Sequence, residues 1–264
     1  LPLASISKTD QDGWSIGPAV AALNVFGTGK RLDLMSRFGG TTEYQAQISG
    51  RQFFGHSTEF SLGWIHGDSY NSFDSTHENT HRIKGEGFWP WVGAREFGMV
   101  GYAEYFWIRA DSTEVTLRTS GDVVPRLGVG LRWDTRDRVL SPCKGFFVET
   151  RVTQNGGVMG GPADFWEGLT DLRAYMFLTK RQGIVTNMLY QYRNGLMGRY
   201  DQFHVGGVNT LRGYPDNSYS GQSECLLNGE YRFDAVEERI QKLGPWSLNY
   251  GVQLVTGVDA AGLW

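Results

Sequence analysis

The sequence predicts an all-β protein, an antiparallel transmembrane β-barrel of which about thirteen strands are present. Three observations lead to this prediction. Apolar and polar residues alternate with a period of two over many segments. Aromatic residues make up 14% of the chain although its mean hydropathy is only -0.35, as expected for strands with one apolar and one polar face. A transmembrane helix would need a run of about 18 apolar residues, which is absent, whereas a barrel strand needs about 9–11 residues.

The strand prediction rests on alternation that can be followed residue by residue. In the segment 127–134, Leu127, Val129, Leu131 and Trp133 share one face and Arg132 lies on the other. The same pattern recurs along the chain, and only the segment 234–243 is a candidate for a short helix. The predicted strands are 2–8, 14–25, 30–38, 43–52, 58–68, 79–89, 98–110, 124–134, 145–154, 164–179, 183–193, 223–233 and 246–256.

The length of the connection after each strand depends on whether the strand is even-numbered or odd-numbered in chain order. The connections after the even strands are mostly compact, at 26–29, 53–57, 89–97 and 180–182. Longer polar loops follow several odd strands, at 69–79, 111–123, 155–163 and 194–222. Short turns at one end and longer loops at the other are typical of outer-membrane barrels. A soluble two-layer sandwich, with its charged residues facing solvent, remains the alternative.

Composition restricts the other classes of protein. The 264 residues carry a formal net charge of -3 and no Lys/Arg-dense run, which argues against nucleic-acid binding. The two cysteines, Cys143 and Cys225, form neither a zinc motif nor a disulfide framework. We therefore expect one barrel domain over residues 1–264. The first residue is Leu1 and the last residues continue a strand pattern, so we expect this domain to be a piece of a longer protein.

A specific loop interrupts the alternation between residues 204 and 219, where the sequence reads HVGGVNTLRGYPDNSY. Glycines at 206 and 207 and the run Pro215-Asp216-Asn217 supply turn chemistry on both sides of Arg212. From these residues alone, Arg212 is either solvated or paired with a buried carboxylate. A guanidinium in a partly desolvated lumen would need such a partner.

This loop resembles the signature loop of the BamA/TamA-type barrel superfamily, also called bacterial surface antigens. That motif is a Gly-Gly pair followed by an apolar residue, Arg, Gly and an aromatic residue. The matching residues are Gly206, Gly207, Leu211, Arg212, Gly213 and Tyr214. Three further segments match in order, namely an early Gly-Thr-Gly turn at 27–29, a mid-barrel periplasmic turn and the strand segment 228–232. The periplasmic turn contains Asp134, Arg136, Asp137, Pro142 and Gly145.

The resemblance implies specific expectations. The family barrel has sixteen strands, so this chain would hold the first thirteen, and periplasmic POTRA domains would precede it. The signature loop would fold into the lumen, where Arg212 would meet an acidic residue of a late strand. Asp259 is the expected partner and Glu230 a second one. The family's aromatic-x-Asp-x-Gly motif is changed here, because Gly257 replaces the aromatic residue and Ala261 replaces the glycine.

Other groups of polar residues are more typical of a structural role than of catalysis or metal binding. The Asp134–Asp137 turn could suggest catalysis or a metal, but Asp-rich turns more often bond to their own backbone. The five histidines are scattered without a third metal ligand, and no G-x-S-x-G elbow is present. We expect no enzyme activity, no metal and no cofactor.

The predicted function is a non-enzymatic outer-membrane barrel for protein insertion, assembly or translocation. Its expected partners are outer-membrane lipids and client outer-membrane or secreted proteins, with POTRA domains and accessory lipoproteins. No nucleic-acid partner is expected. Three alternatives stay open: a membrane anchor for a passenger domain, a simple pore, and a soluble all-β protein.

Overall fold

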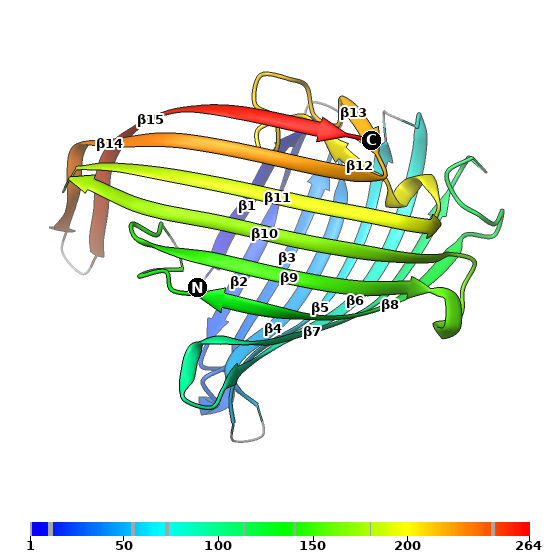
Figure 1. Ribbon diagram of the computed structural model, residues 1–264, viewed down its shortest axis with the longest axis horizontal. Helices are drawn as coiled ribbons and strands as arrows, with labels where there is room; N and C mark the ends of the chain where they lie inside the picture. The colour runs from blue at the N-terminus through cyan, green and yellow to red at the C-terminus, as the bar shows by residue number, and fades with distance from the viewer. Residues whose placement is uncertain are drawn as a thin grey trace.

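The chain forms one large antiparallel sheet that curls into an open half-barrel (Figure 1). The computed structural model describes residues 2–9, 13–53, 56–71, 74–112, 114–139, 141–179, 181–243 and 246–264. Thirteen strands pair in chain order: β1 (Pro2–Thr9), β2 (Gly13–Leu23), β3 (Arg31–Gly39), β4 (Thr42–Phe53), β5 (His56–Asn71), β6 (Thr76–Trp91), β7 (Ala94–Ala110), β8 (Asp122–Asp134), β9 (Gly145–Gly156), β10 (Asp164–Thr179), β11 (Gln182–Leu196), β14 (Ser223–Leu243) and β15 (Trp246–Leu263).

Three short 3₁₀ turns and a small second sheet complete the described structure. The turns are η1 (Val25–Gly27), η2 (Gly157–Met159) and η3 (Arg199–Asp201). The second sheet pairs β12 (Phe203–Val205) with β13 (Tyr219–Gly221) inside the connection between β11 and β14. No helix of the described residues has the length and apolar character that crossing a bilayer would require.

The predicted fold class is confirmed, since each of the thirteen predicted strands corresponds to one strand of the large sheet. Among the described residues, the only strands outside this large sheet are β12 and β13 of one connection, which do not form a second layer of a sandwich, so the sandwich alternative is wrong. Strands β1 and β15 form its two edges, and among the described residues they do not pair with each other. The sheet is therefore open between them.

Two local predictions are wrong. The segment 234–243 is not a helix, because β14 continues to Leu243 and pairs with β15 as far as Leu243↔Trp246. Cross-strand hydrogen bonds, accommodated by two bulges between Asp234 and Arg239, override its helical propensity. The predicted long loop 69–79 is also wrong. Strands β5 and β6 pair up to Asn71↔Thr76, which leaves only residues 72–75 as a connection.

The two faces of the sheet differ in the way the alternation predicts. On β8, Leu127, Val129, Leu131 and Trp133 are exposed on the convex face. Arg126 and Arg132, on the concave face, have side chains that are only 12% and 17% exposed. In a water-soluble protein, exposure of so many large apolar side chains over one sheet would be costly. In a membrane barrel this face contacts lipid and the concave face lines a polar lumen.

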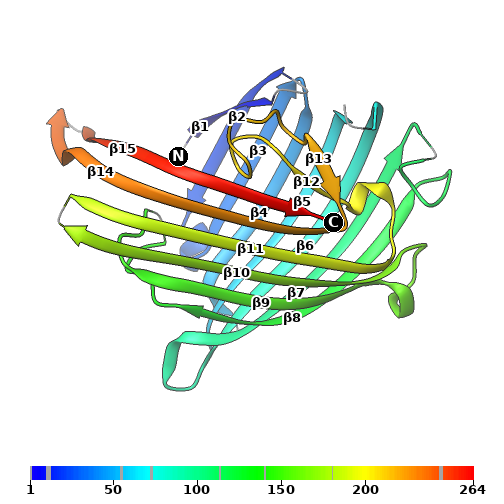
Figure 2. The same ribbon diagram turned by 45° about the horizontal axis from the view of Figure 1, so that its top comes forward.

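The two ends of the sheet carry different connections, as Figure 2 shows. Turns after even-numbered strands of the β1–β11 meander lie at one end, together with the β14–β15 hairpin. The connections after odd-numbered strands lie at the other end, and the longest of them joins β11 to β14 through residues 197–222. We call the first end the turn rim and the second the loop rim.

Candidate functional site

The candidate site is the connection 197–222, which folds back over the concave face of the sheet (Figures 1 and 2). Its two ends are joined by the β12–β13 pair, with Phe203↔Gly221 and Val205↔Tyr219 in register. The signature residues 206–214 therefore form the tip of a closed loop. This tip reaches β14 and β15, where the partners of Arg212 lie.

The tip begins with two glycines whose backbone conformation other residues rarely adopt. Gly206 has a φ of 135° and Gly207 a φ of 89°. A Cβ atom on Gly207 would lie 1.8 Å from Oδ1 of Asp216, so a side chain there would displace the second half of the loop. Leu211 forms an isolated bridge with Gly207. The Gly207 N–H donates to the Tyr214 carbonyl at 3.0 Å, which closes the turn around Arg212 and Gly213.

Arg212 forms a bidentate ion pair with Asp259 of β15. Its Nε donates to Oδ2 at 2.7 Å and its Nη2 to Oδ1 at 2.5 Å. The backbone N–H of Arg212 adds a third bond to the same carboxylate at 3.1 Å. Nη1 donates to Oε1 of Glu230 on β14 at 2.9 Å. The hydrogen bonds to Asp259 raise the pKa of the Arg212 guanidinium above its ordinary value.

Neighbouring side chains orient this pair. Nδ2 of Asn228 donates to Oδ1 of Asp259 at 2.9 Å, and Arg232 donates to the second oxygen of Glu230 at 2.8 Å. The Asp259 side chain is only 7% exposed, while that of Arg212 is 37% exposed. A Cβ on Gly257 would lie 3.1 Å from Nη2 of Arg212. The same Cβ would lie 2.6 Å from the Gly229 carbonyl oxygen, so a side chain at 257 would crowd both β14 and the guanidinium.

A second attachment of the loop was not predicted from the sequence. Asp201 of η3 accepts a hydrogen bond from Nη2 of Arg126 on β8 at 2.6 Å. Both side chains are deeply buried, at 4% and 12% exposed. Arg193 of β11 donates to the Asp201 carbonyl and to Glu167 of β10, at 2.7 Å for the carboxylate. This end of the loop is therefore fixed to β8 and β11, and Arg193 in turn connects β11 to β10.

The same end of the loop covers an apolar cluster on the concave face, which we call the lumenal core. It consists of Phe106, Ile108, Val124, Ala163 and Phe165, with Met197 and Tyr200 of the loop packed against it. The Tyr200 ring lies 5.8 Å from that of Phe106. A buried apolar core thus occupies the lumen near the loop rim. Alternation could not reveal it, because most other residues on this face are polar.

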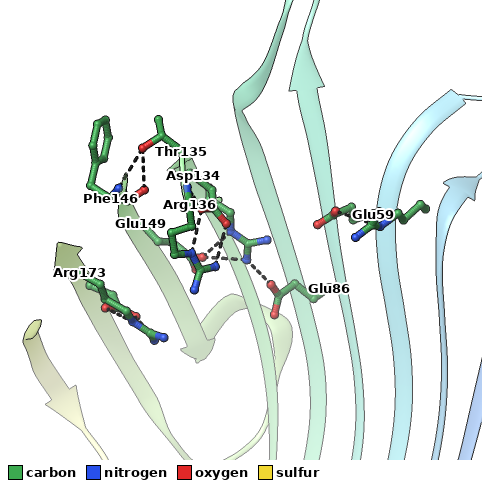
Figure 3. Close-up of polar contacts among 11 residues, drawn as sticks. Glu59, Glu86, Asp134, Thr135, Arg136, Phe146, Glu149 and Arg173 are labelled. Atoms are coloured by element: carbon green, nitrogen blue, oxygen red, sulfur yellow. Dashed lines mark hydrogen bonds and ion pairs between the residues drawn. The ribbon is translucent and has the colours of Figure 1, made fainter. Parts of the chain in front are cut away.

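The predicted periplasmic turn joins β8 to β9 at the turn rim, and its carboxylates bind within the turn; Figure 3 shows Asp134 beside Arg136. Asp134 accepts hydrogen bonds from the backbone and side chain of Arg136, at 3.1, 2.9 and 2.8 Å. Asp137 accepts from the backbone N–H groups of Cys143, at 3.0 Å, and Lys144, at 3.2 Å. These bonds, that from Cys143 foremost, lower the pKa of Asp137. Pro142 precedes Cys143 and is half-buried.

Gly145 ends this turn at a position that excludes a side chain. Its φ is 102°, and a Cβ would lie 2.4 Å from the Thr135 carbonyl oxygen. We expect Gly145→Ala to lower the free energy of unfolding by about 1–3 kcal/mol, measured by urea titration in detergent. Gly168→Ala is the matched control, because its Cβ would meet no atom within 4 Å. Equal effects of the two substitutions would contradict this role.

Charged pairs continue along the concave wall near this turn. Nη2 of Arg132 lies 2.6 Å from Glu86 of β6 and 2.8 Å from Glu149 of β9 (Figure 3). Arg136 lies over the ring of Phe147 at 4.6 Å. Among the residues that the structure describes, no three His, Cys, Asp or Glu side chains gather to hold a metal ion. The polar groups of the site thus connect strands and loop to one another.

Comparison with known proteins shows to which family this architecture belongs. The model of the Omp85 superfamily domain matches residues 24–264. The outer membrane protein assembly factor BamA of Nitratidesulfovibrio vulgaris is 23% identical over 211 residues, which are 76% of this chain and 25% of that protein.

Solved structures share the fold at lower identity. BamA from Haemophilus ducreyi lacking POTRA domains 1–3 is 15% identical, with a TM-score of 0.68 over 89% of this chain and 52% of that one. CdiB from Escherichia coli is 14% identical, with a TM-score of 0.69 over 98% of this chain and 51% of that one. The chain spans a quarter of the curated relative and about half of these structures. It is an outer-membrane β-barrel protein, and it belongs to the Omp85 superfamily.

Proposed function

We propose that this chain is the barrel part of an outer-membrane protein that inserts or translocates other polypeptides without catalysing a reaction. Membership of the Omp85 superfamily and similarity to an assembly factor support this proposal. The clients would be outer-membrane or secreted proteins, and POTRA domains and accessory lipoproteins would be its partners on the periplasmic side.

The observation that carries the proposal is the weak attachment of the first hairpin. Strand β1 has eight residues and, among the described strands, pairs only with β2. The β2–β3 ladder lacks pairs at Gly17 and Pro18, between Ile16↔Phe38 and Ala19↔Met35. Pro18 has no N–H to donate, so this part of the ladder is weakened. An extended client strand could therefore pair with the edge of β1 by β-augmentation.

The loop would stay attached to the concave face while the edge of β1 pairs with a client strand. Arg212 connects it to β14 and β15, and Asp201 connects it to β8, all far along the chain from β1. The edge of β1 can then separate or pair without the loop leaving the concave face. The pairing of Arg212 would thus preserve one wall of the barrel while the other edge accepts a client.

The test is disulfide trapping in the full-length protein. A cysteine is introduced at Ser7 of β1 in a Cys143→Ser/Cys225→Ser background, and the client carries single cysteines in its last strand. We expect a mixed disulfide during client insertion into liposomes, at one register. The matched control places the cysteine at Thr150 of β9, a strand paired on both sides, where no adduct should form.

Four outcomes would contradict the proposal. Adducts at Ser7 and Thr150 in equal yield would indicate non-specific contact. Insertion that proceeds without an adduct at Ser7 would exclude the β1 edge. Ion conductance without any client insertion would identify a simple pore, and activity located only in an attached domain would identify a membrane anchor.

A further inference from the structure

The two rims of the sheet differ in charge. In the described connecting residues of the turn rim, at 24–30, 92–93, 135–139, 141–144 and 181, five side chains are basic and one is acidic: Lys30, Arg136, Arg138, Lys144, Arg181 and Asp137. In those of the loop rim, at 40–41, 74–75, 111–112, 114–121, 157–163 and 197–222, three are basic and five are acidic: Arg118, Arg199, Arg212, Asp74, Asp111, Glu114, Asp201 and Asp216. The turn rim is thus net positive and the loop rim net negative.

Basic side chains of the turn rim are available for an external partner. Arg138 and Lys144 are exposed, and among the described residues neither forms an ion pair within 4 Å. Lys30, which ends the β2–β3 turn, lies 5.9 Å from the ring of Phe60 rather than beside a carboxylate. These three side chains come from two turns that are far apart in the sequence. They therefore give the rim a distributed positive charge.

Two turns of this rim present apolar tips. Phe26 is 98% exposed in the β2–β3 turn and Val92 is 99% exposed in the β6–β7 turn, whereas Val139 of the β8–β9 turn lines a cavity with Glu86 and Arg132 of the concave wall. Phe26 has a φ of 51°, which is strained for a bulky residue. Side-chain bonds hold this turn, because the Gly29 N–H donates to Oδ1 of Asn24 at 2.8 Å. The fold thus maintains an aromatic side chain at the tip.

These tips continue an aromatic belt on the convex face. Trp89 and Trp91 are exposed on β6, directly before Val92, and the Trp133 ring meets that of Phe146 at 4.7 Å. Belts of this kind lie at the level of the lipid headgroups. The turn tips, which follow the belt along the chain, therefore lie where headgroups begin. A tip that points into water alone would gain nothing from being apolar.

We propose that the turn rim is a binding surface for anionic lipid headgroups, with Lys30, Arg138 and Lys144 contacting the phosphates and Phe26 and Val92 inserted between the lipids. Apolar side chains beside basic ones are the combination that binds an anionic bilayer surface. An acidic protein would account for the charges but not for apolar tips adjoining the belt. This role is independent of whether the protein inserts clients.

The test uses the full-length protein in vesicles of phosphatidylcholine with 20% phosphatidylglycerol, an amount of about one lipid in five chosen to populate an anionic surface. Val92→Cys, in a Cys143→Ser/Cys225→Ser background, carries an environment-sensitive fluorophore. Quenching is compared between phosphatidylglycerol and phosphatidylcholine, each spin-labelled near the headgroup and used at equal mole fraction. We expect about threefold more quenching by the anionic lipid.

Two matched variants make the result specific. Lys30→Gln/Arg138→Gln/Lys144→Gln should retain quenching but lose the preference for phosphatidylglycerol, while heat-modifiable migration shows that it is folded. A fluorophore at Val158, which is 99% exposed at the loop rim, should show no such preference. Absence of quenching at position 92, equal quenching by both lipids, or the same preference at position 158 would overturn the proposal. A blue-shifted emission without lipid quenching would instead assign the rim to a protein partner.

Discussion

Replacing Arg212 by alanine in the full-length protein will lower the free energy of unfolding of the barrel by about 2 kcal/mol. The substitution removes three side-chain hydrogen bonds, two to Asp259 and one to Glu230. It leaves the Asp259 carboxylate, which is only 7% exposed, with Asn228 and the loop backbone as partners. The exposure of Arg212 itself, at 37%, keeps the expected loss below that of a fully buried pair. The loss in free energy of unfolding is measured by following heat-modifiable gel migration as the urea concentration is raised.

Two controls separate the anchoring role from a general effect of charge. Arg212→Lys keeps the charge but not the bidentate geometry, so it should lose about half of the stabilisation. Arg232→Ala removes a neighbouring arginine that bonds to Glu230 within the same strand, and it should change stability by less than about 1 kcal/mol. Unchanged unfolding and unchanged client insertion in Arg212→Ala would contradict the proposed role.

Removing the carboxylate of Asp201 will have the larger effect, about 3–5 kcal/mol, because Asp201→Ala breaks a buried ion pair. Arg126 would keep only Glu104, 3.9 Å away, while its side chain stays 12% exposed. The loop would also lose its hold on the lumenal core, so we expect higher ion conductance through the lumen. Chemical denaturation and planar-bilayer recording on the same preparation measure the two effects.

A compensating variant tests whether the pair itself is responsible. Replacing both charges, in Arg126→Met/Asp201→Leu, should recover most of the stability, because no unpaired charge is left buried. Arg173→Ala removes an ion pair with Asp171 of the same strand, remote from the loop, in which the two side chains are 42% and 15% exposed, and it should cost less than about 1 kcal/mol. If the double variant were no more stable than Asp201→Ala, the effect would come from packing and not from the pair.

The sequence by itself determined the strands and their faces. The period-two pattern places Leu127 and Trp133 on one side of β8 and Arg132 on the other, and the side-chain direction follows from backbone geometry alone. The turn between Asp134 and Gly145 was also predictable from local sequence, because its hydrogen bonds join residues close in the chain. The resemblance of the loop supplied Asp259 and Glu230 as partners for Arg212, which alternation could not have done.

Only the tertiary structure decided the lumenal core and its ion pair. Arg126 and Asp201 are 75 residues apart, and nothing in either segment specifies the other. Their meeting depends on how far the sheet curves and on the path of a long connection. The misassigned helix at 234–243 has the same cause, since its strand exists through pairing with β15. Local patterns encode which face a side chain occupies, whereas curvature and loop path follow from the packing of all strands together.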